Sequence, residues 1–416
     1  MKPPRVLDLF AGCGGLSCGL EMAGFEVVAG NDILAPAARS HSINHKSSKF
    51  FVGSITDASV REQVVDYAIK LGTEVVVGGP PCQAYSLAGK RDVDDDRGHL
   101  FEDYVAVVDA VRPKLFVMEN VKGLLSMMHD RDDLNAGERS LLDRVKGLER
   151  EQLELRKRRK QSKNTSRFKF DDRDTRRLER ISAEILKLRT DTRNLRESVP
   201  EKIVRRLEGL GYRVEYRLLN AADYGVPQRR ERVIFFGTSI DAPIKFPEAT
   251  HREPSEATSI FDKQLQPWVT TRDAIGDLEN ALEDVEWSHE FTRHKSDFVE
   301  RLAQTPVGSS VYEGFSDAWY RQPPDEPSRT VKENHGGVFV HYAQPRVMTP
   351  RELARLQSFP DSFRFAGSKS QVLVQIGNAV PPLLGKAIGH SLREMLAGVR
   401  SGAARTRRRS ASAIAG

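Results

Sequence analysis

A cysteine at position 82 stands where a thiol could serve as a nucleophile. It follows the apolar run 74–77, which predicts a buried strand, and the turn Gly78-Gly79-Pro80-Pro81 ends that strand abruptly. The two prolines fix φ and remove two backbone donors, so we expect a stiff loop. Open α/β sheets place their chemistry on such loops, at the carboxyl ends of strands. Cys82 taken alone is equally compatible with a small buried apolar side chain, so the neighbouring motifs must decide its role.

A carboxylate and an arginine cluster are predicted to reach the same edge of the sheet. Glu119 follows the buried strand 115–118, and a carboxylate beside a nucleophile can act as a general acid or base. An isolated Glu at a strand end is more often a solvated surface group. The cluster 228–232 (Gln-Arg-Arg-Glu-Arg) directly precedes the strand 233–237. Arginine forks suit phosphates and carboxylates, although a solvated strand end explains the cluster as well.

The N-terminal segment predicts a site for an adenosine cofactor. A strand over 6–10, a glycine-rich turn over 11–15 and a helix over 16–23 lead to a second strand that ends at Asp32. This is a βαβ unit with an acid at the tip of its second strand. Ser17 stands where a nicotinamide-binding turn would have its third glycine. We therefore expect a different adenosine cofactor, with Asp32 accepting hydrogen bonds from the ribose hydroxyls.

Taken together and in order, these segments resemble the motifs of the cytosine-5 DNA methyltransferases. The resemblance covers about 1–125, 200–240 and 326–395. It implies an α/β fold with a Rossmann-like S-adenosylmethionine-dependent methyltransferase domain and a smaller target-recognition domain. The matching motifs are Asp8-Leu-Phe-Ala-Gly-Cys-Gly-Gly-Leu16, Pro80-Pro-Cys-Gln83, Glu119-Asn-Val121, Gln228-Arg-Arg-Glu-Arg232, Pro350-Arg-Glu-Leu-Ala-Arg355, Phe359-Pro-Asp-Ser-Phe363 and Gly377-Asn-Ala-Val-Pro-Pro382.

The resemblance also implies a reaction, the transfer of a methyl group from S-adenosylmethionine to carbon 5 of cytosine. Carbon 5 is a poor nucleophile, and a thiolate adding at carbon 6 turns the ring into an enamine that can attack the methyl group. By resemblance Cys82 supplies the thiolate, and Glu119, protonated when the base is bound, donates to ring nitrogen 3. Arg230 and Arg232 match positions that contact the base carbonyl and position the catalytic loop. Access to both ring faces implies base flipping, with the loop 83–97 closing over the cytosine.

The cofactor site implied by the resemblance draws on several segments. Asn378, expected near the start of a helix, should lie beside Phe10 and Gly12, because the family's last motif folds back onto the cofactor half. The sequence departs from the family at Tyr85, where Phe is common, and at 53–55, which lacks the acid often found near the adenine amino group. The predicted S-adenosylmethionine-binding residues are Phe10, Gly12, Gly14, Gly15, Leu16, Asp32, Ile33, Ile55, Pro80, Leu100, Asn378 and Ala379, and no metal is expected.

Composition and charge agree with a nucleic-acid enzyme. The chain has 416 residues, enough for a core domain and a second module, and its net charge of +6 suits a polyanionic partner. Three cysteines give neither a disulfide framework nor a zinc set, so Cys13 and Cys18 are interpreted as packing residues. The sequence shows no signal peptide and no apolar run of about 18 residues. We expect a cytoplasmic protein of a bacterial or archaeal cell that acts as a monomer on double-stranded DNA, with a cognate restriction endonuclease as a candidate partner.

A charged segment interrupts the predicted catalytic domain. Residues 138–197 hold 32 Asp, Glu, Lys or Arg among 60. Two apolar stripes with heptad spacing predict an antiparallel coiled-coil hairpin that turns near Asn164. Its cations suit DNA phosphates, although a merely solvated hairpin fits equally well. The stripes consist of Leu141, Val145, Leu148 and Leu155, and of Leu178, Ile181, Ile185, Leu188, Leu195 and Val199.

The remaining segments complete the predicted domain map. The segment 241–325 has little regular periodicity and holds all three tryptophans, and by resemblance it reads the target sequence in the major groove. Candidate readers within it are 270–272 (Thr-Thr-Arg) and 321–322 (Arg-Gln). The predicted divisions are a catalytic domain over 1–137 and 200–240, a hairpin over 138–199, a recognition domain over 241–325, a C-terminal return over 326–398 and a disordered basic tail over 399–416.

Two alternative functions fit parts of the pattern. An RNA cytosine-5 methyltransferase of the same fold would carry the same catalytic motifs, and only the size of the 241–325 segment favours duplex DNA. A non-catalytic nucleic-acid-binding regulator could use the same scaffold. The presence of Cys82, Glu119 and Arg230 speaks against a regulator, because a binding protein does not need the thiol.

Overall fold

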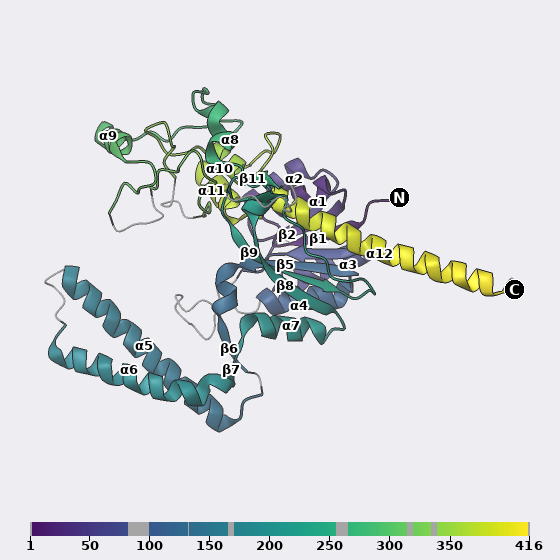
Figure 1. The fold of residues 1–416 in the computed structure, drawn as a ribbon, viewed down its shortest axis with the longest axis horizontal. Helices are drawn as coiled ribbons and strands as arrows, with labels where there is room; N and C mark the ends of the chain where they lie inside the picture. The colour runs from purple at the N-terminus through teal and green to yellow at the C-terminus, as the bar shows by residue number, and fades with distance from the viewer. Residues whose placement is uncertain are drawn as a thin grey trace. The chain divides into compact units, whose positions relative to one another are not determined.

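The computed structural model describes residues 2–81, 100–131, 133–164, 170–254, 265–313, 319–333 and 339–414. The described chain forms two compact units (Figure 1). One unit contains residues up to 122 and from 206 onward, and the other contains 123–205.

A seven-stranded sheet in the order β3-β2-β1-β4-β5-β9-β8 forms the centre of the first unit. The strands β1 to β5 run parallel, whereas β9 runs antiparallel to both β5 and β8. This mostly parallel sheet confirms the predicted α/β, Rossmann-like class. The strands are β1 (Arg5–Leu9), β2 (Glu26–Asp32), β3 (Lys49–Val52), β4 (Val75–Gly78), β5 (Leu115–Val121), β8 (Arg213–Asn220) and β9 (Glu231–Thr238).

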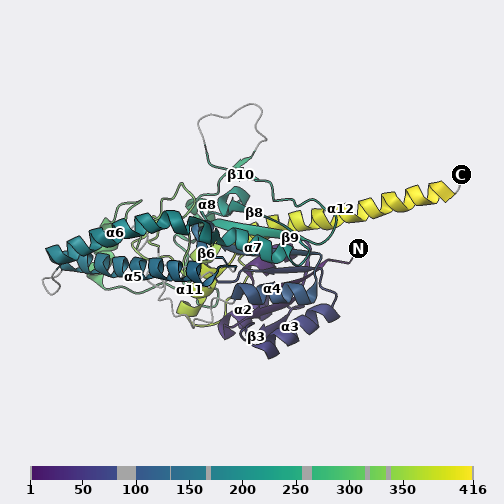
Figure 2. The same cartoon turned by 90° about the horizontal axis from the view of Figure 1, so that it is seen from below.

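The central strands of the sheet are buried on both faces, which explains why they are continuous apolar runs rather than alternating ones, whereas the edge strands β3 and β8 are largely exposed. All of β4 is buried, as are Leu115 to Met118 of β5. α3 (Ala58–Lys70) and α4 (Leu100–Val111) lie side by side, joined by the Arg61–Asp103 ion pair (Figure 2). The other helices of this unit include α1 (Gly15–Met22), α2 (Ala35–Asn44) and α12 (Pro382–Ile414). The boundary between the two units falls within α7 (Val199–Glu208), of which only the part from Arg206 onward belongs to this unit.

α12 packs directly against α1, so the C-terminal part of the chain returns to the N-terminal motif. A Cβ placed on Gly19 would lie 2.2 Å from the Pro382 carbonyl oxygen, and one on Gly389 would lie 2.5 Å from Cβ of Ala23. Only glycine permits the helix backbones to approach this closely. The late motifs are therefore part of the same core as the first strand.

Short elements make up most of the segment between β9 and α12. Their packing depends on buried polar side chains as well as on an apolar cluster around Tyr320, Phe339, Leu353 and Phe359. The elements are β10 (His251–Arg252), β11 (Gln266–Pro267), α8 (Thr271–Ile275), α9 (Ser296–Gln304), α10 (Pro350–Leu356) and α11 (Lys369–Asn378), with the 3-10 helix η6 (Gly276–Leu278); a further 3-10 helix, η5 (Ala221–Tyr224), joins β8 to β9.

The second unit consists mainly of two long helices, α5 (Ala136–Asn164) and α6 (Asp172–Thr192). A small antiparallel pair, β6 (Met128–Asp130) and β7 (Arg196–Ser198), lies at their base, flanked by η3 (Lys122–Ser126) and η4 (Arg193–Leu195). Leu155, Leu178, Ile181 and Ile185 form one buried cluster, and Leu134, Leu142 and Leu195 form another. Leu142, rather than the predicted Leu141, is the fully buried residue of the second cluster. The heptad supercoil itself stays a prediction.

Element ends differ from the sequence-based expectation at two places near the late motifs. Asn378 is the last residue of α11, whereas the sequence placed it near the start of a helix. The next helix begins at Pro382, because proline suits a first helical turn and disfavours helix in the residue before it. α12 continues to Ile414, into the segment where composition predicted a disordered tail. That segment is rich in Ala and Arg, which favour helix.

Candidate functional site

The turns that follow β1 and β4 meet where the strand order of the sheet reverses. β1 and β4 are neighbours, with Leu9 paired to Gly78, and the chain crosses to opposite sides of the sheet from these two strands. Open α/β sheets bind ligands at this topological switch point. The glycine-rich turn 11–15 and the Pro80-Pro81 turn therefore border one candidate site.

The chain approaches position 82 directly beside Glu119. A Cβ placed on Gly79 would lie 3.0 Å from Glu119 Oε2. Asn120 Nδ2 donates a hydrogen bond of 3.0 Å to the Pro80 carbonyl, which fixes the turn against β5. Cys82, together with the rest of the loop 83–97, lies outside the described residues. The predicted strand 115–118 is longer in the structure, because β9 pairs with β5 as far as Val121 and includes Glu119 in the sheet.

Glu119 is paired with Arg232 from the neighbouring strand. Arg232 Nε lies 2.8 Å from Glu119 Oε1, and the two side chains are only 12% and 13% exposed. The antiparallel register places Val121 opposite Arg232 and Ile234 opposite Glu119, so the two side chains meet diagonally across the strands. A carboxylate held on one side by a guanidinium and bordered on the other by Gly79 has a fixed orientation.

Arg230 has a different position from Arg232, although the sequence places them two residues apart. It is buried, and its two terminal nitrogens donate to the carbonyls of Val331 (2.9 Å) and Gly377 (3.0 Å). Burial, and then the nearby Arg232, lower the pKa of the Arg230 guanidinium well below its usual value, whereas Glu119 raises it. Arg230 therefore joins β9 to two distant late segments, and its terminal nitrogens are already used.

The turn after β1 forms a cradle with open space above it. Gly12 and Gly14 have left-handed backbone conformations (φ 54° and 95°), which glycine adopts without strain. Asp32 Oδ2 accepts from the Gly12 amide at 3.0 Å and Oδ1 accepts from the Leu34 amide at 2.9 Å. A Cβ placed on Gly12 would meet no atom within 4 Å, and the Ile33 side chain is 65% exposed. An acid, an exposed apolar side chain and free space over a glycine turn fit an adenosine cofactor.

The segment 375–380 closes one side of this cradle. A Cβ on Gly15 would lie 2.4 Å from the Val380 carbonyl oxygen and 3.1 Å from Cβ of Ala379. The Cys13 thiol contacts the Gln375 carbonyl at 3.7 Å. The expected return of the last motif to the first one is therefore present, with Asn378 at the end of α11.

The remaining predicted cofactor residues have different environments. Phe10 has a left-handed backbone conformation (φ 55°) in the turn, and Leu16 is buried in α1. Pro80 is buried beside Asn120, and Leu100 is the first residue of α4. Ile55 is buried, with only 1% of the residue exposed.

A buried polar network behind the glycine turn was not predicted. Ser17 Oγ donates to Asp8 Oδ2 at 2.6 Å and lies 3.3 Å from His41 Nε2, and His45 Nδ1 is paired with Glu21 at 2.8 Å. Burial raises the pKa of Asp8 to about 7 and lowers that of His41 to about 3. The spacing of the two histidines, one helical turn apart, is the signal that could have indicated this network.

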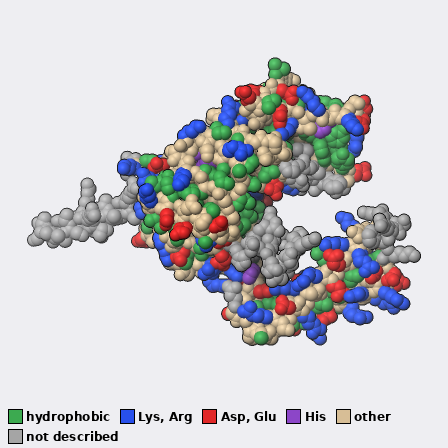
Figure 3. Space-filling model, turned by 180° about the vertical axis from the view of Figure 1, so that it is seen from behind, with side chains coloured by type: hydrophobic (Ala, Val, Ile, Leu, Met, Phe, Trp, Pro, Cys, Tyr) green, Lys and Arg blue, Asp and Glu red, His purple; other side chains and the backbone are tan. Residues whose placement is uncertain are grey.

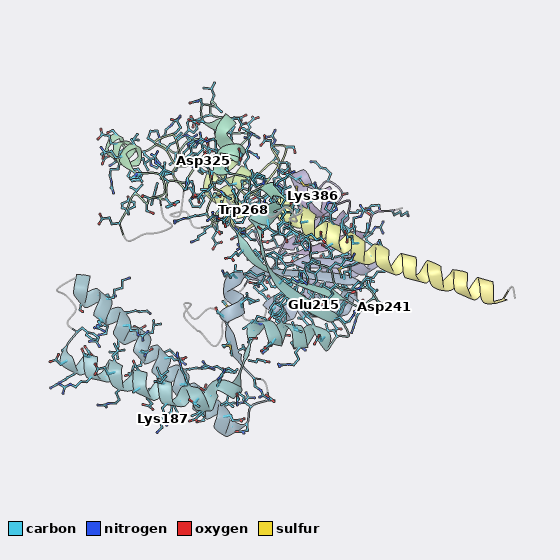
Figure 4. All side chains as sticks on the ribbon, viewed as in Figure 1. Lys187, Glu215, Asp241, Trp268, Asp325 and Lys386 are labelled. Atoms are coloured by element: carbon cyan, nitrogen blue, oxygen red, sulfur yellow. The ribbon has the colours of Figure 1, made fainter. Side chains whose placement is uncertain are left out.

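The residues proposed as base readers have structural roles instead. Thr271 and Gln322 are fully buried, and Arg321 Nη1 donates to the Tyr342 carbonyl at 3.2 Å. Thr270 caps α8, and Arg272 Nε is paired at 3.2 Å with Asp325, which is labelled in Figure 4. The assignment was wrong for the buried residues, because a segment with few regular elements uses polar side chains to satisfy its own backbone groups.

The late motif 350–355 also anchors this segment. Arg351 is fully buried and donates to the carbonyls of Trp287 (2.9 Å) and Phe363 (2.8 Å). Burial lowers its pKa to about 10. Glu352 caps α10 and pairs with Arg346 at 2.7 Å. The motif therefore supports the fold around the candidate recognition segment rather than the reaction.

Within the ranges that the structure describes, no group of three or more His, Cys, Asp or Glu side chains could hold a metal ion. None of the helices in the described part of the chain combines the length and apolar character needed to cross a membrane.

Comparisons with known proteins agree with this arrangement. The sequence model of the family "C-5 cytosine-specific DNA methylase" matches residues 4–138 and 188–394. The chain is 31% identical to Type II methyltransferase M1.HphI of Haemophilus parahaemolyticus over 94% of this chain and 86% of that protein. It is 30% identical to M.NgoFVII of Neisseria gonorrhoeae over 91% and 83% of the two chains. A solved putative DNA modification methyltransferase from an E. coli prophage shares the fold, with a TM-score of 0.63 at 22% identity over 94% of this chain and 99% of that one.

Proposed function

The chain belongs to the C-5 cytosine-specific DNA methylases, and we propose that Cys82, Glu119 and Arg232 carry out its reaction on a flipped cytosine of duplex DNA. Enzymes of this family are DNA (cytosine-5-)-methyltransferases that use S-adenosylmethionine, and this chain is one of them. The observation that carries the proposal is the position of Glu119, which borders the turn leading to Cys82 and pairs with Arg232 at 2.8 Å.

Cys82 is assigned as the nucleophile. Its thiolate forms a bond to carbon 6 of the cytosine, and the electron pair of the 5,6 double bond makes carbon 5 nucleophilic. A thiolate suits this step because it attacks strongly and can also leave. The hydrogen bond from Asn120 to the Pro80 carbonyl holds the Pro80-Pro81 turn against β5. This fixed turn supports the assignment of the residue that follows it, Cys82, as the nucleophile.

Glu119 is assigned as the proton donor to ring nitrogen 3. Attack at carbon 6 puts negative charge on the ring, and a proton at nitrogen 3 neutralises it. Arg232 orients the carboxyl group through the ion pair, and on this ground we assign to it the contact with the base carbonyl that the resemblance implies for Arg230 and Arg232 together. Arg230 is assigned as a positioning residue, because its guanidinium joins β9 to the Val331 and Gly377 segments.

The cradle around Gly12 is assigned to S-adenosylmethionine, which when bound supplies an electrophilic methyl group. Asp32 holds the ribose hydroxyls while its carboxylate also keeps the Gly12 and Leu34 amides in place. Ile33 offers an exposed apolar surface for the adenine ring. After the transfer a base must remove the carbon 5 proton, and Cys82 then leaves to restore the double bond.

The biological role is proposed from the relatives. M1.HphI and M.NgoFVII are named as Type II methyltransferases, so we propose that this chain methylates a specific short sequence in the cytoplasm of a bacterial cell, as a monomer alongside a cognate endonuclease. The segment 241–325 is proposed to read that sequence. Bisulfite sequencing of DNA from cells that express the protein should reveal one methylated motif. Methylation scattered without a shared sequence would contradict the assignment.

A variant of the nucleophile tests the proposal most simply. Cys82→Ser should abolish methyl transfer to DNA and leave the affinity for S-adenosylmethionine within a few fold of the wild type, because a serine alkoxide is inaccessible near neutral pH. Cys18→Ser, in the buried face of α1, is the matched control and should retain activity. Turnover of Cys82→Ser near the wild-type rate would overturn the assignment of the nucleophile.

A further inference from the structure

One end of the α5–α6 hairpin concentrates the positive charge of the protein. Residues 156–177 hold 11 Lys or Arg and only 3 Asp or Glu, whereas the rest of 138–197 holds 9 of each kind. The chain outside 138–197 carries 44 basic and 46 acidic residues. The whole excess of positive charge in the chain, +6, therefore depends on this one end of the hairpin.

The described cations at this end, in 156–160 and 173–177, are exposed, and several of them form no ion pair with a described carboxylate. Figure 3 shows Lys and Arg side chains spread over both helices. Within the described residues, no carboxylate forms an ion pair with Arg156, Arg159, Lys160 or Arg173, and all four are exposed. At the opposite end of the hairpin, Lys146 is paired with Asp130. Unpaired charges that repel one another destabilise a protein unless a polyanion neutralises them.

The arrangement of these cations fits a phosphate backbone better than base edges. α6 has 21 residues and so extends about 30 Å, which places its basic end far from the β6–β7 pair. Exposed Lys and Arg side chains both bind phosphate oxygens, and phosphate contacts carry no sequence information directly. The family model matches 4–138 and 188–394, so most of this hairpin lies outside the shared methylase machinery.

We propose that the segments 156–160 and 173–177, the basic end of the hairpin, form an arm that binds the phosphate backbone of duplex DNA. The proposal rests on the proposed function, because duplex DNA is the substrate assigned there. The arm adds affinity without contributing to base choice or to the chemical step. Such contacts bind DNA of any sequence, so they can hold the enzyme on the duplex before the target sequence is found.

The test compares two triple variants that remove the same charge. Arg156→Gln/Arg159→Gln/Lys160→Gln neutralises the basic end, and Lys187→Gln/Arg189→Gln/Arg193→Gln neutralises the opposite end (Lys187 is labelled in Figure 4). The dissociation constant for a duplex is measured from 50 to 200 mM salt. Each lost phosphate contact should remove about 0.9 from the salt slope. If all three contacts are lost, raising the salt from 50 to 200 mM should weaken DNA binding by the first variant about 40-fold less than it weakens binding by the wild type.

The second variant should keep the wild-type slope, and Arg156→Lys/Arg159→Lys should keep it too, because lysine retains the charge. The methylation rate at saturating DNA and the methylated motif should be unchanged in every variant, which separates this test from that of the catalytic assignment. A wild-type salt slope in the first variant would overturn the proposal that this arm binds DNA phosphates. The exposed cations would then be assigned to binding a partner protein. An equal change in both triple variants would show a general effect of net charge, and would also overturn it.

Discussion

Arg232 Nε lies 2.8 Å from Glu119 Oε1, and this ion pair joins two sequence motifs that are more than a hundred residues apart. The antiparallel pairing of β9 with β5 brings them together, since it continues along β5 to Val121. The side chains are mostly buried, so the geometry of the pair is set by the sheet rather than by mobile surface groups. The proposed proton donor is thereby oriented before any base enters the site.

Replacing Glu119 with glutamine should slow the reaction without preventing DNA binding. The amide keeps the shape of the side chain but cannot transfer a proton to nitrogen 3, and general acid help is typically worth about 10²–10⁴ in rate. Single-turnover methyl transfer measures the loss. Glu231→Gln is the matched control, because Glu231 begins the neighbouring strand β9, directly before Arg232, is exposed and pairs with Lys122. A similar loss in both variants would remove Glu119 from its assigned role.

Removing the Asp32 carboxylate should weaken the binding of S-adenosylmethionine. Asp32→Ala loses the acceptor for the ribose and the two bonds that hold the turn, and a hydrogen bond to a charged group is worth about 1.5–3 kcal/mol. Calorimetry should show an affinity lower by roughly 10- to 150-fold. Asp57→Ala, which removes the cap of α3, should lower the Tm and leave the affinity unchanged. Equal affinities of wild type and Asp32→Ala would place the ribose elsewhere.

The buried carboxyl of Asp8 should make the stability of the protein depend on pH. Burial raises its pKa from 3.8 to about 7, so the folded state holds the proton that the unfolded state releases between these values. The contribution of Asp8 to the stability is therefore fully present below about pH 4 and is lost as the pH rises through about 7. Around the carboxyl, Ser17 and His45 oppose the shift, and Asp32 adds to it. Asp8→Asn should flatten this part of the pH profile of Tm, and an unchanged profile would refute the shift.

Much of the fold and part of the site could be predicted from the sequence. The β-branched run 74–77 and the turn after it are local signals, and they correctly indicated β4 and a switch-point loop. Cys82 was identified the same way, although it lies outside the described residues. The pairing of β5 with β9 is not local, because it depends on which distant strand lies beside Glu119.

The roles of the buried polar residues could not be predicted from the sequence. Arg230 and Arg232 are the same residue type in the same motif, and the sequence does not distinguish them. In the structure Arg230 donates to backbone carbonyls, whereas Arg232 pairs with the Glu119 carboxylate. Thr271 and Gln322 were predicted to read bases because their side chains are polar. They are fully buried, and this burial depends on tertiary packing that the local sequence does not show. Most side-chain hydrogen bonds go to backbone groups or water, so a polar side chain in an irregular segment does not by itself indicate a ligand-binding role.

A methyl group added at Gly377 should disturb the anchor of Arg230. A Cβ there would lie 2.3 Å from the Glu333 amide nitrogen, and the backbone would have to shift, moving the Gly377 carbonyl away from Arg230. Overpacking typically costs about 1–3 kcal/mol. Thermal unfolding of Gly377→Ala should show this loss together with reduced activity. Gly147→Ala in α5 has open space and should instead stabilise by about 0.5–1 kcal/mol. Retention of both Tm and activity in Gly377→Ala would contradict the anchoring role.

The covalent step is tested most directly with duplex DNA that carries 5-fluorocytosine at the target position. Fluorine at carbon 5 cannot be removed as a proton, so the enzyme should stay bonded to the DNA after methyl transfer and migrate with it in denaturing gels. Peptide mapping should place the bond at Cys82. Cys18→Ser should still form the adduct, because burial raises the pKa of Cys18 to about 12 and keeps that thiol protonated. No adduct should form with Cys82→Ser, and an adduct that persists in this variant or maps to another residue would contradict the mechanism.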